Sequence, residues 1–410
     1  MSQPNPSPEH HSGAEHHKVV IVGGGTGGIT VAARLRRAGL DDVTVVEPSS
    51  SHHYQPLLTL VGGGRCPASA TVRPEADVMP KDVTWVREAA TGTDPAAQTV
   101  TTESGRTLHY DYLVMAPGIQ LDFGKVPGLT EALGQGGVSS NYRFDLAPRT
   151  WEFIRDLRGG TALFTMPAGP IKCAGAPQKI AYLAADWWRS QGVLDRTRVI
   201  LVLPTAAMFS QPDWAKVLEG IAAGYGIEVR KESQLVEVDG DSNRAVIADT
   251  KAGTKETIHY DILHATPPQS APDWVKATPL ADPAGPFGYV QVGKHTLQSA
   301  DWPNVFALGD VSNLPTSKTG AAARHQAPVL VANLLAAMRG QALSGHYNGY
   351  TSCPLVTSRN RMLLAEFDYD LKRAPSIPFI NTLKPRYDMW LLKRYGLPSM
   401  YWNLMLKGRL

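Results

Sequence analysis

The glycine-rich segment at residues 23–28, whose sequence is GGGTGG, constrains the fold of this chain more than any other stretch. It follows directly after the apolar run Val19–Val22, which is typical of a buried parallel strand. Residues 29–38 then carry apolar side chains at helical spacing, and a second apolar run, Val43–Val46, is closed by Glu47. This order predicts a strand–helix–strand unit with a glycine-rich turn at its first junction.

Three glycines of this segment each have a physical role. Gly23 permits a tight turn, Gly25 lets the backbone approach a diphosphate, and Gly28 lets the helix pack on the strand. The N-terminus of the helix carries a partial positive charge that suits a diphosphate, and Glu47 is placed to accept hydrogen bonds from ribose hydroxyls. These features predict a dinucleotide-binding site, which also includes Gly24, Thr26 and Gly27.

Two segments far along the chain favour FAD as the dinucleotide. Met115–Gly118 and Asn304–Asp310 each end a predicted strand. Both resemble motifs of flavoproteins that have two dinucleotide-binding domains, in which the final aspartate contacts the ribityl chain or the diphosphate. The resemblance implies FAD-binding roles for Gly118 and Asp310, and a carboxylate that caps a loop is the alternative for Asp310.

A second predicted strand–turn–helix junction lacks the glycine fingerprint. It reads FTMPAGPIKCAGAP over residues 164–177. Proline removes backbone N–H donors and fixes φ, so this turn cannot cradle a diphosphate as a glycine loop does. A nicotinamide dinucleotide is therefore disfavoured as electron donor. The turn carries Cys173 instead, whose thiol pKa we expect the neighbouring Lys172 and the following helix to lower.

The whole pattern predicts an α/β protein with two tandem Rossmann-like dinucleotide-binding domains, the second inserted in the first, and a C-terminal membrane-anchoring helical region. Further strands are predicted at 112–115, 161–165, 199–203, 262–265 and 305–308, and helices at 176–189 and 214–224. The predicted division is a disordered leader at 1–17, an FAD-binding domain at 18–145 and 275–345, a second domain at 146–274, and a C-terminal region at 346–410.

The composition of the 410 residues narrows the function classes. A net charge of +3 gives no reason to expect nucleic acid as a partner. Three cysteines cannot form a secreted disulfide framework, and the histidines lack metal-ligand spacing. No run of eighteen apolar residues predicts a membrane-spanning helix. The leader shows neither an apolar signal segment nor an Arg-rich transit pattern.

Residues 384–410 combine basic and aromatic side chains. Six basic residues stand against Asp388 alone: Lys384, Arg386, Lys393, Arg394, Lys407 and Arg409. Two apolar–aromatic stretches, 387–395 and 400–406, are separated by Gly396 and Pro398, which predicts two short amphipathic helices. This pattern is typical of a monotopic membrane anchor, and a helical pair packed on the domain or on a partner chain is the alternative. We expect a peripheral protein of a bacterial inner membrane, or of the mitochondrial inner membrane in a eukaryote, with homo-oligomers left open.

Five short motifs carry a resemblance that covers the chain from about Lys18 to its end. They are KCAGAPQK at 172–179, YTSCPLV at 350–356, AEFDY at 365–369, YQP at 54–56 with TLVG at 59–62, and NLPTSKT at 313–319. Together they resemble the sulfide:quinone oxidoreductases of the mitochondrial type. The two cysteine motifs are the most specific part of this resemblance.

The resemblance implies a redox pair, Cys173 and Cys353, closed as a disulfide or bridged by an extra sulfur. Hydrogen sulfide would attack one sulfur, leave a persulfide on Cys353, and free Cys173 as the thiolate that faces and reduces a non-covalent FAD. The electrons would pass to ubiquinone or menaquinone. The sulfane sulfur would pass to sulfite, glutathione or another sulfide.

Expectations can be stated for four further residues. Lys318 is expected near the flavin or the quinone, where its charge stabilises reduced species, and a plain surface lysine is the alternative. Gln55 is expected to bond the flavin, and the resemblance implies that backbone near Ala90 holds the adenine. Cys66 has no counterpart in the motifs and is expected to be an incidental surface thiol.

Three other readings stay open. Two are related oxidoreductases, a type II NADH:quinone reductase and the flavoprotein subunit of a flavocytochrome c sulfide dehydrogenase. The third is a non-catalytic flavin-binding or sulfur-carrier protein. The proline-containing second turn argues against the NADH reductase, and the aromatic–basic tail argues against the flavocytochrome subunit.

Overall fold

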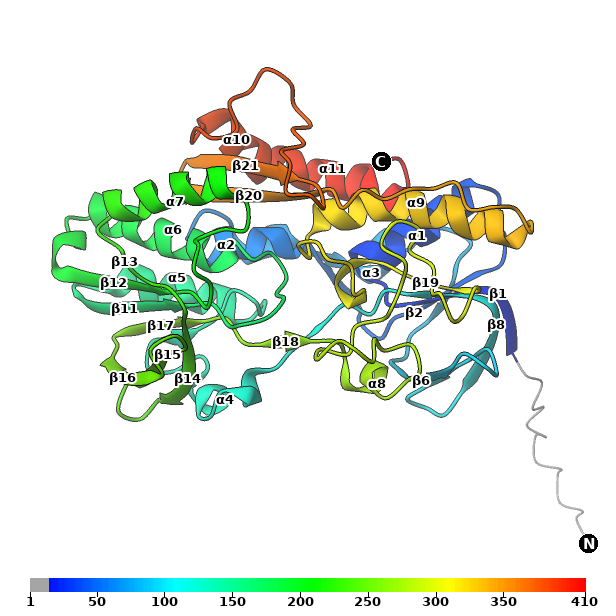
Figure 1. Ribbon diagram of the computed structural model, residues 1–410, viewed down its shortest axis with the longest axis horizontal. Coiled ribbons are helices and arrows are strands. Elements are labelled where there is room, and N and C mark those ends of the chain that lie inside the picture. The colour runs from blue at the N-terminus through cyan, green and yellow to red at the C-terminus, as the bar shows by residue number, and fades with distance from the viewer. Residues whose placement is uncertain (1–14) are drawn as a thin grey trace, which may run out of the picture.

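The first sheet carries the glycine-rich turn and lies on the right in Figure 1. In the computed structural model, which describes residues 15–410, its parallel strands run in the order β5-β2-β1-β8, and β19 also pairs with β8. Strands β7 and β6 extend the sheet in antiparallel fashion. The strands are β1 (Glu15–Val22), β2 (Val43–Val46), β5 (Thr84–Val86), β6 (Ala90–Asp94), β7 (Thr99–Thr102), β8 (Thr107–Met115) and β19 (Val305–Ala307).

Burial on both faces explains why β-branched residues dominate the centre of this sheet. Val19 pairs with Val43 of β2 and with Tyr112 of β8, and its side chain is fully buried. Helices α1 (Thr26–Arg37) and α9 (Gly320–Met338) pack against each other. The strands predicted at residues 43–46, 112–115 and 305–308 are confirmed as β2, β8 and β19.

The start of β1 corrects one prediction. The strand begins at Glu15, whereas the sequence predicted that order begins at Lys18. Residues 15–17 pair with residues 108–110 of β8, because the backbone ladder continues and the Glu15 carboxylate accepts a 2.7 Å hydrogen bond from Arg106. The rest of the predicted leader, residues 1–14, lies outside the described residues.

The second sheet is entirely parallel and lies on the left in Figure 1. Its order is β10-β17-β11-β12-β13, and it is accompanied by α5 (Leu146–Asp156), α6 (Ala176–Ser190) and α7 (Pro212–Gly224). The strands are β10 (Val138–Ser139), β11 (Gly160–Thr165), β12 (Thr197–Val202), β13 (Glu228–Arg230) and β17 (Ile262–Ala265). Two Rossmann-like parallel sheets are thus confirmed.

Smaller elements complete the two units. An antiparallel sheet of β14 (Ser233–Asp239), β15 (Arg244–Asp249) and β16 (Thr254–His259) was not predicted. The pair β9 (Gln120–Leu121) and β18 (Gln269–Ser270) lies where the chain passes between the sheets (Figure 1). The hairpin of β3 (Ser51–His53) and β4 (Val72–Pro74) is followed by α3 (Glu75–Val78), and α2 (Leu58–Gly62) lies within it.

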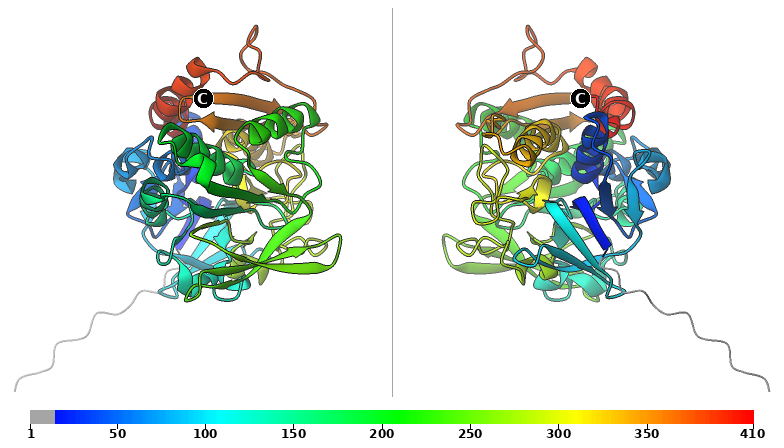
Figure 2. Two further views of the ribbon diagram at one scale, coloured as in Figure 1. Left: turned by 90° about the vertical axis from the view of Figure 1, so that its left-hand side faces the viewer. Right: turned by 90° about the vertical axis from the view of Figure 1, so that its right-hand side faces the viewer.

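The C-terminal residues form a layer over both sheets, which lies at the top of Figure 1 and of both views in Figure 2. It contains the hairpin of β20 (Thr351–Ser358) and β21 (Arg361–Phe367). Helix α10 (Tyr387–Leu391) continues through a π-helical turn (Leu392–Gly396) into α11 (Leu397–Asn403). The structure thus has two short helices here, as predicted, with bounds that differ from the predicted stretches and with a π-helical turn between them. Pro398 lies in the first turn of α11, where a missing N–H costs little.

Much of this segment packs on the protein itself. Trp390, Tyr401, Trp402, Met405 and Leu406 are buried in a core that also includes α2 and the hairpin β20–β21. Among residues 15–410, no helix is long and apolar enough to cross a membrane.

The contact between α1 and the turn before it can be tested by two glycine substitutions. A Cβ at Gly28 would lie 1.8 Å from the carbonyl oxygen of Gly23, so Gly28→Ala should destabilise the protein by about 3 kcal/mol. Gly220, on the exposed face of helix α7, has open space where a Cβ would lie, so Gly220→Ala should stabilise the protein by about 0.8 kcal/mol. Urea unfolding of both variants measures the difference, and a neutral Gly28→Ala would contradict the close packing.

Candidate functional site

A cavity of about 680 Å³ joins the glycine-rich turn to Cys173 and to the C-terminal helices. It takes its lining from elements of both sheets and of the C-terminal layer. Most of the predicted site residues line it: Gly23, Gly25, Thr26, Gly27, Glu47, Gln55, Gly118, Cys173, Asp310 and Lys318. Ala90, the first residue of β6, is not among the lining residues, and its role stays a prediction.

The turn at residues 23–25 fits a dinucleotide diphosphate. A Cβ added to Gly25 would meet nothing within 4 Å, so the backbone faces open space beside the first turn of α1. No side chain of the described residues caps that helix, which leaves its N-terminal N–H groups available for an anion. Gly23 must be glycine, because its φ is +101° and a Cβ would lie 2.3 Å from the Ala116 oxygen.

Glu47 lies at the end of β2, as predicted, and contacts this turn. Its Oε2 accepts a 2.7 Å hydrogen bond from the Gly24 N–H, and its Oε1 accepts one from the Ser49 N–H at 2.8 Å. Burial raises the pKa of this carboxyl, although both hydrogen bonds act in the opposite direction. A ribose hydroxyl donating to the same carboxylate would favour its ionised form.

Asp310 and Lys318 face the cavity as an interacting pair of opposite charges. Burial raises the pKa of the Asp310 carboxyl, while the charge of Lys318 opposes that shift. Lys318 Nζ donates to the carbonyl oxygens of Asp310 and Ser312 at 2.7 and 2.8 Å and lies 3.7 Å from the ring centre of Tyr289. Burial lowers the pKa of Lys318 to about 8. The surface-lysine alternative is therefore wrong.

The fold brings Cys173 and Cys353 together from distant parts of the chain. Their Sγ atoms lie 3.5 Å apart, and both are free thiols. Cys173 occupies the turn before α6 with a φ of +53°, and its N–H donates to the carbonyl oxygen of Lys318 at 2.8 Å. Cys353 lies on β20 and is 1% exposed.

Lys179, which the sequence analysis did not single out, is the charged neighbour of this pair. Its Nζ donates to Cys173 Sγ at 2.9 Å from the first turns of α6. The pKa of Cys173 is held well below its usual range, because Cys353 donates a hydrogen bond to it and the Lys179 ammonium lies beside it. The same hydrogen bond raises the pKa of Cys353.

The expected role of Lys172 is wrong. Its Nζ donates to Gln55 Oε1 at 2.7 Å, because the turn directs this side chain toward the residues before α2 and away from the thiols. Gln55 is therefore held at the cavity by a lysine of the second unit, and its contact with a flavin stays a prediction.

Two further corrections concern residues that were expected at the surface. Lys393 is 2% exposed, lines the cavity, and donates to the carbonyl oxygen of Pro56 at 3.0 Å. Burial, together with the charge of Lys179, lowers its pKa to about 7. Cys66 is 8% exposed and belongs to the core under the C-terminal helices, where burial raises its pKa. Sequence pattern missed the burial of Lys393 because a basic aromatic helix reads the same whichever face is buried. It missed that of Cys66 because a single cysteine in a connecting segment carries no signal of what packs on it.

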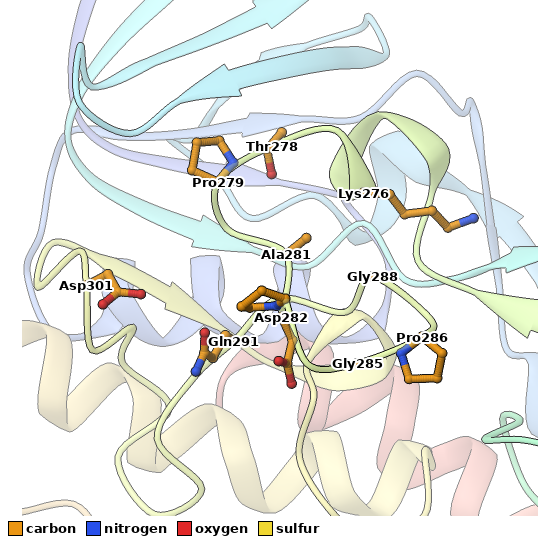
Figure 3. Close-up of a pocket in the computed structure, with 11 residues that line it drawn as sticks. Lys276, Thr278, Pro279, Ala281, Asp282, Gly285, Pro286, Gly288, Gln291 and Asp301 are labelled. Carbon is orange, nitrogen blue, oxygen red and sulfur yellow. The ribbon is translucent and has the colours of Figure 1, made fainter.

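A second hollow, of about 550 Å³, lies beside α8 (Asp273–Lys276) (Figure 3). It is lined by proline and glycine turns together with a few polar side chains, such as Lys276, Asp282, Gln291 and Asp301. It contains neither a cysteine nor any predicted site residue, so it is separate from the redox chemistry.

Comparison with known proteins agrees with this geometry. Residues 17–327 match the family described as pyridine nucleotide-disulphide oxidoreductase. The chain is 44% identical to a mitochondrial sulfide:quinone oxidoreductase of Dictyostelium discoideum, over 87% of this chain and 78% of that protein. It is 42% identical to the one from Mus musculus, over 86% and 78%.

The chain belongs to the sulfide:quinone oxidoreductase family. The resemblance seen in the sequence motifs is thereby confirmed, and the family is one of FAD-binding flavoproteins. A sulfide:quinone oxidoreductase structure from Aquifex aeolicus has the same fold, with a TM-score of 0.79 at 20% identity over 97% of this chain and 92% of that one.

The role of Lys179 can be tested by the pH dependence of thiol alkylation in the reduced protein. Lys179→Met removes the ammonium beside Cys173, so the thiolate should form at higher pH. We expect the midpoint of the iodoacetamide rate against pH to rise by roughly one to two pH units. Lys172→Met is the matched control and should leave the midpoint unchanged, because Lys172 contacts Gln55 instead. An unchanged midpoint in Lys179→Met would contradict the assignment.

Proposed function

We propose that this protein oxidises hydrogen sulfide at the Cys173–Cys353 pair and passes the electrons through non-covalent FAD to a membrane quinone. One observation carries the proposal: two thiols 3.5 Å apart, one of them lining a cavity that begins at a diphosphate-type turn. The chain's close relatives bear the name of this activity.

The unequal thiols give the direction of the first step. In the oxidised pair, hydrosulfide attacks Cys353 Sγ, the S–S bond breaks, and Cys173 leaves as a thiolate. Cys173 is the better leaving group because the Lys179 ammonium, 2.9 Å from its Sγ, stabilises the charge that appears there. The added sulfur remains on Cys353 as a persulfide.

FAD, when bound, accepts the two electrons that re-form the disulfide after the outer sulfur has left. Residues 23–27 would hold its diphosphate and Glu47 its ribose, while Asp310 would contact the ribityl chain. Lys318 and Lys172 would place positive charge beside a reduced, anionic ring. The outer sulfur would pass to sulfite, glutathione or another sulfide.

The turn between β11 and α6 bears on the identity of the electron donor. Residues 166–175 separate β11 from α6, whereas only residues 23–25 separate β1 from α1. The longer turn contains Pro167 and Pro170 and places Cys173 where a second dinucleotide would otherwise meet the helix. This arrangement supports sulfide, and argues against NADH, as the source of electrons.

The C-terminal layer supports a membrane position for the quinone. Among the described residues, the exposed large hydrophobic side chains all lie in it: Leu371, Phe379, Tyr387, Leu391, Tyr395 and Leu404. The cavity extends to Ile377, Leu392, Leu397 and Met400 of the same layer. We infer that this face rests on a bacterial inner membrane, or on the mitochondrial one in a eukaryote, and that quinone enters here.

Anaerobic titration with sulfide tests the redox pair. The wild-type flavin absorbance should bleach and recover on addition of a soluble ubiquinone, while NADH should not bleach it at a comparable rate. Cys173→Ser and Cys353→Ser should each slow bleaching by roughly a thousandfold. Cys66→Ser should bleach at the wild-type rate, because this buried thiol lies in a separate core. Full turnover in both pair variants would instead indicate a non-catalytic flavin protein.

Vesicle binding tests the membrane face. Leu391→Glu combined with Tyr395→Glu places two charges on the exposed apolar side chains of one helical segment. Each apolar side chain is worth about 1.5–3 kcal/mol when buried, so binding to phosphatidylglycerol-containing vesicles should fall at least about tenfold. Lys251→Glu, in an exposed turn of the second unit, changes the net charge equally and is the control. An equal loss of vesicle binding in the control would show that the change in net charge, and not the apolar face, accounts for the effect.

A further inference from the structure

The C-terminal segment is bonded directly to the diphosphate turn. The Tyr401 hydroxyl lies 2.9 Å from Oγ1 of Thr26, the first residue of α1, and both residues line the cavity. The same hydroxyl lies 2.6 Å from His52 Nε2, and His52 Nδ1 lies 3.1 Å from Glu75 Oε2. Four segments that are far apart in the sequence therefore meet in one hydrogen-bonded chain.

This chain of contacts is almost completely shielded from water. Glu75, His52 and Tyr401 are 1%, 3% and 4% exposed. The ring of Tyr401 also packs on that of Tyr54, with their centres 4.4 Å apart. A buried polar group that loses its partner costs more than an exposed one, so Tyr401 is held firmly in place and Thr26 with it.

Gly408 and Leu410 contact helix α1 at a second point. Gly408 has a φ of +65°, and a Cβ there would lie 2.9 Å from the backbone of Ala33 and Arg34 in α1. The Arg34 guanidinium donates to the backbone oxygen of Leu410, and Lys407 Nζ donates to the carbonyl oxygen of Asp77 at 3.2 Å. Residues 397–410 thus hold α1 at its first residue and again in its last turns.

We propose that residues 397–410 are a strap that retains FAD, and that Tyr401 is the positioning residue through which the strap acts on the diphosphate turn. Met400, Tyr401, Met405 and Leu410 form one wall of the cavity, beside the turn at residues 23–27. With the strap docked, Thr26 is fixed and the first N–H groups of α1 keep one orientation. Detachment of the strap frees Thr26 and removes that wall, so FAD leaves more readily.

The rate of FAD release from the holoenzyme tests this role. FAD is diluted out of the protein, and the rise in free-flavin fluorescence is followed over time. Tyr401→Phe should release FAD about tenfold faster than wild type, and Gly408→Ala should also release it faster. Tyr395→Phe, which removes an exposed hydroxyl from the same segment, should match wild type.

A thermodynamic cycle separates retention from plain loss of stability. The melting temperature of Tyr401→Phe apoprotein should fall, because buried His52 loses its hydroxyl partner, and the increase produced by added FAD should in addition be smaller than in wild type. Thr26→Val should speed release similarly, and the double variant should release FAD no faster than either single variant. Wild-type release rates in Tyr401→Phe, additive effects in the double variant, or a wild-type increase in melting temperature on addition of FAD would each overturn the proposal. None of these readouts depends on sulfide.

Discussion

The cysteine pair depends on one close approach, that of strand β20 to the residue before helix α6. Gly175 occupies this point, and a Cβ there would lie 2.4 Å from Leu355 Cδ2 and 3.2 Å from Cys353 Sγ. A side chain at this position would therefore require Leu355 to shift and would crowd Cys353. Because the hairpin also forms part of the core under the C-terminal helices, the thiol pair and the outer layer are positioned by the same contact.

The electrostatics of the site follow from that packing. Lys179, Lys318 and Lys393 each line the cavity and are each less than a tenth exposed. A buried ammonium is unfavourable unless a negative charge lies near it, and the Cys173 thiolate supplies that charge for Lys179. The cavity consequently favours anionic species, which include a thiolate, hydrosulfide and a reduced flavin.

The C-terminal segment has two different faces. One face packs Tyr401, Trp402 and Met405 against the glycine-rich helix and the hairpin β3–β4, while the other exposes Leu391, Tyr395 and Leu404. A helix that is apolar on both faces can contribute to a core and to an apolar surface at the same time. The cofactor turn, the cavity wall and the proposed lipid contact are therefore carried by one continuous stretch of chain.

The sequence by itself determined the two parallel sheets, the glycine-rich turn and Glu47, because strand, turn and helix signals act over a few neighbouring residues. The cysteine motifs also identified the family. Only the tertiary structure decided which lysine serves Cys173, that Lys393 and Cys66 are buried, and that Tyr401 reaches Thr26. Those outcomes depend on how elements far apart in the chain pack, and local patterns carry no information about which face of a helix meets its neighbour.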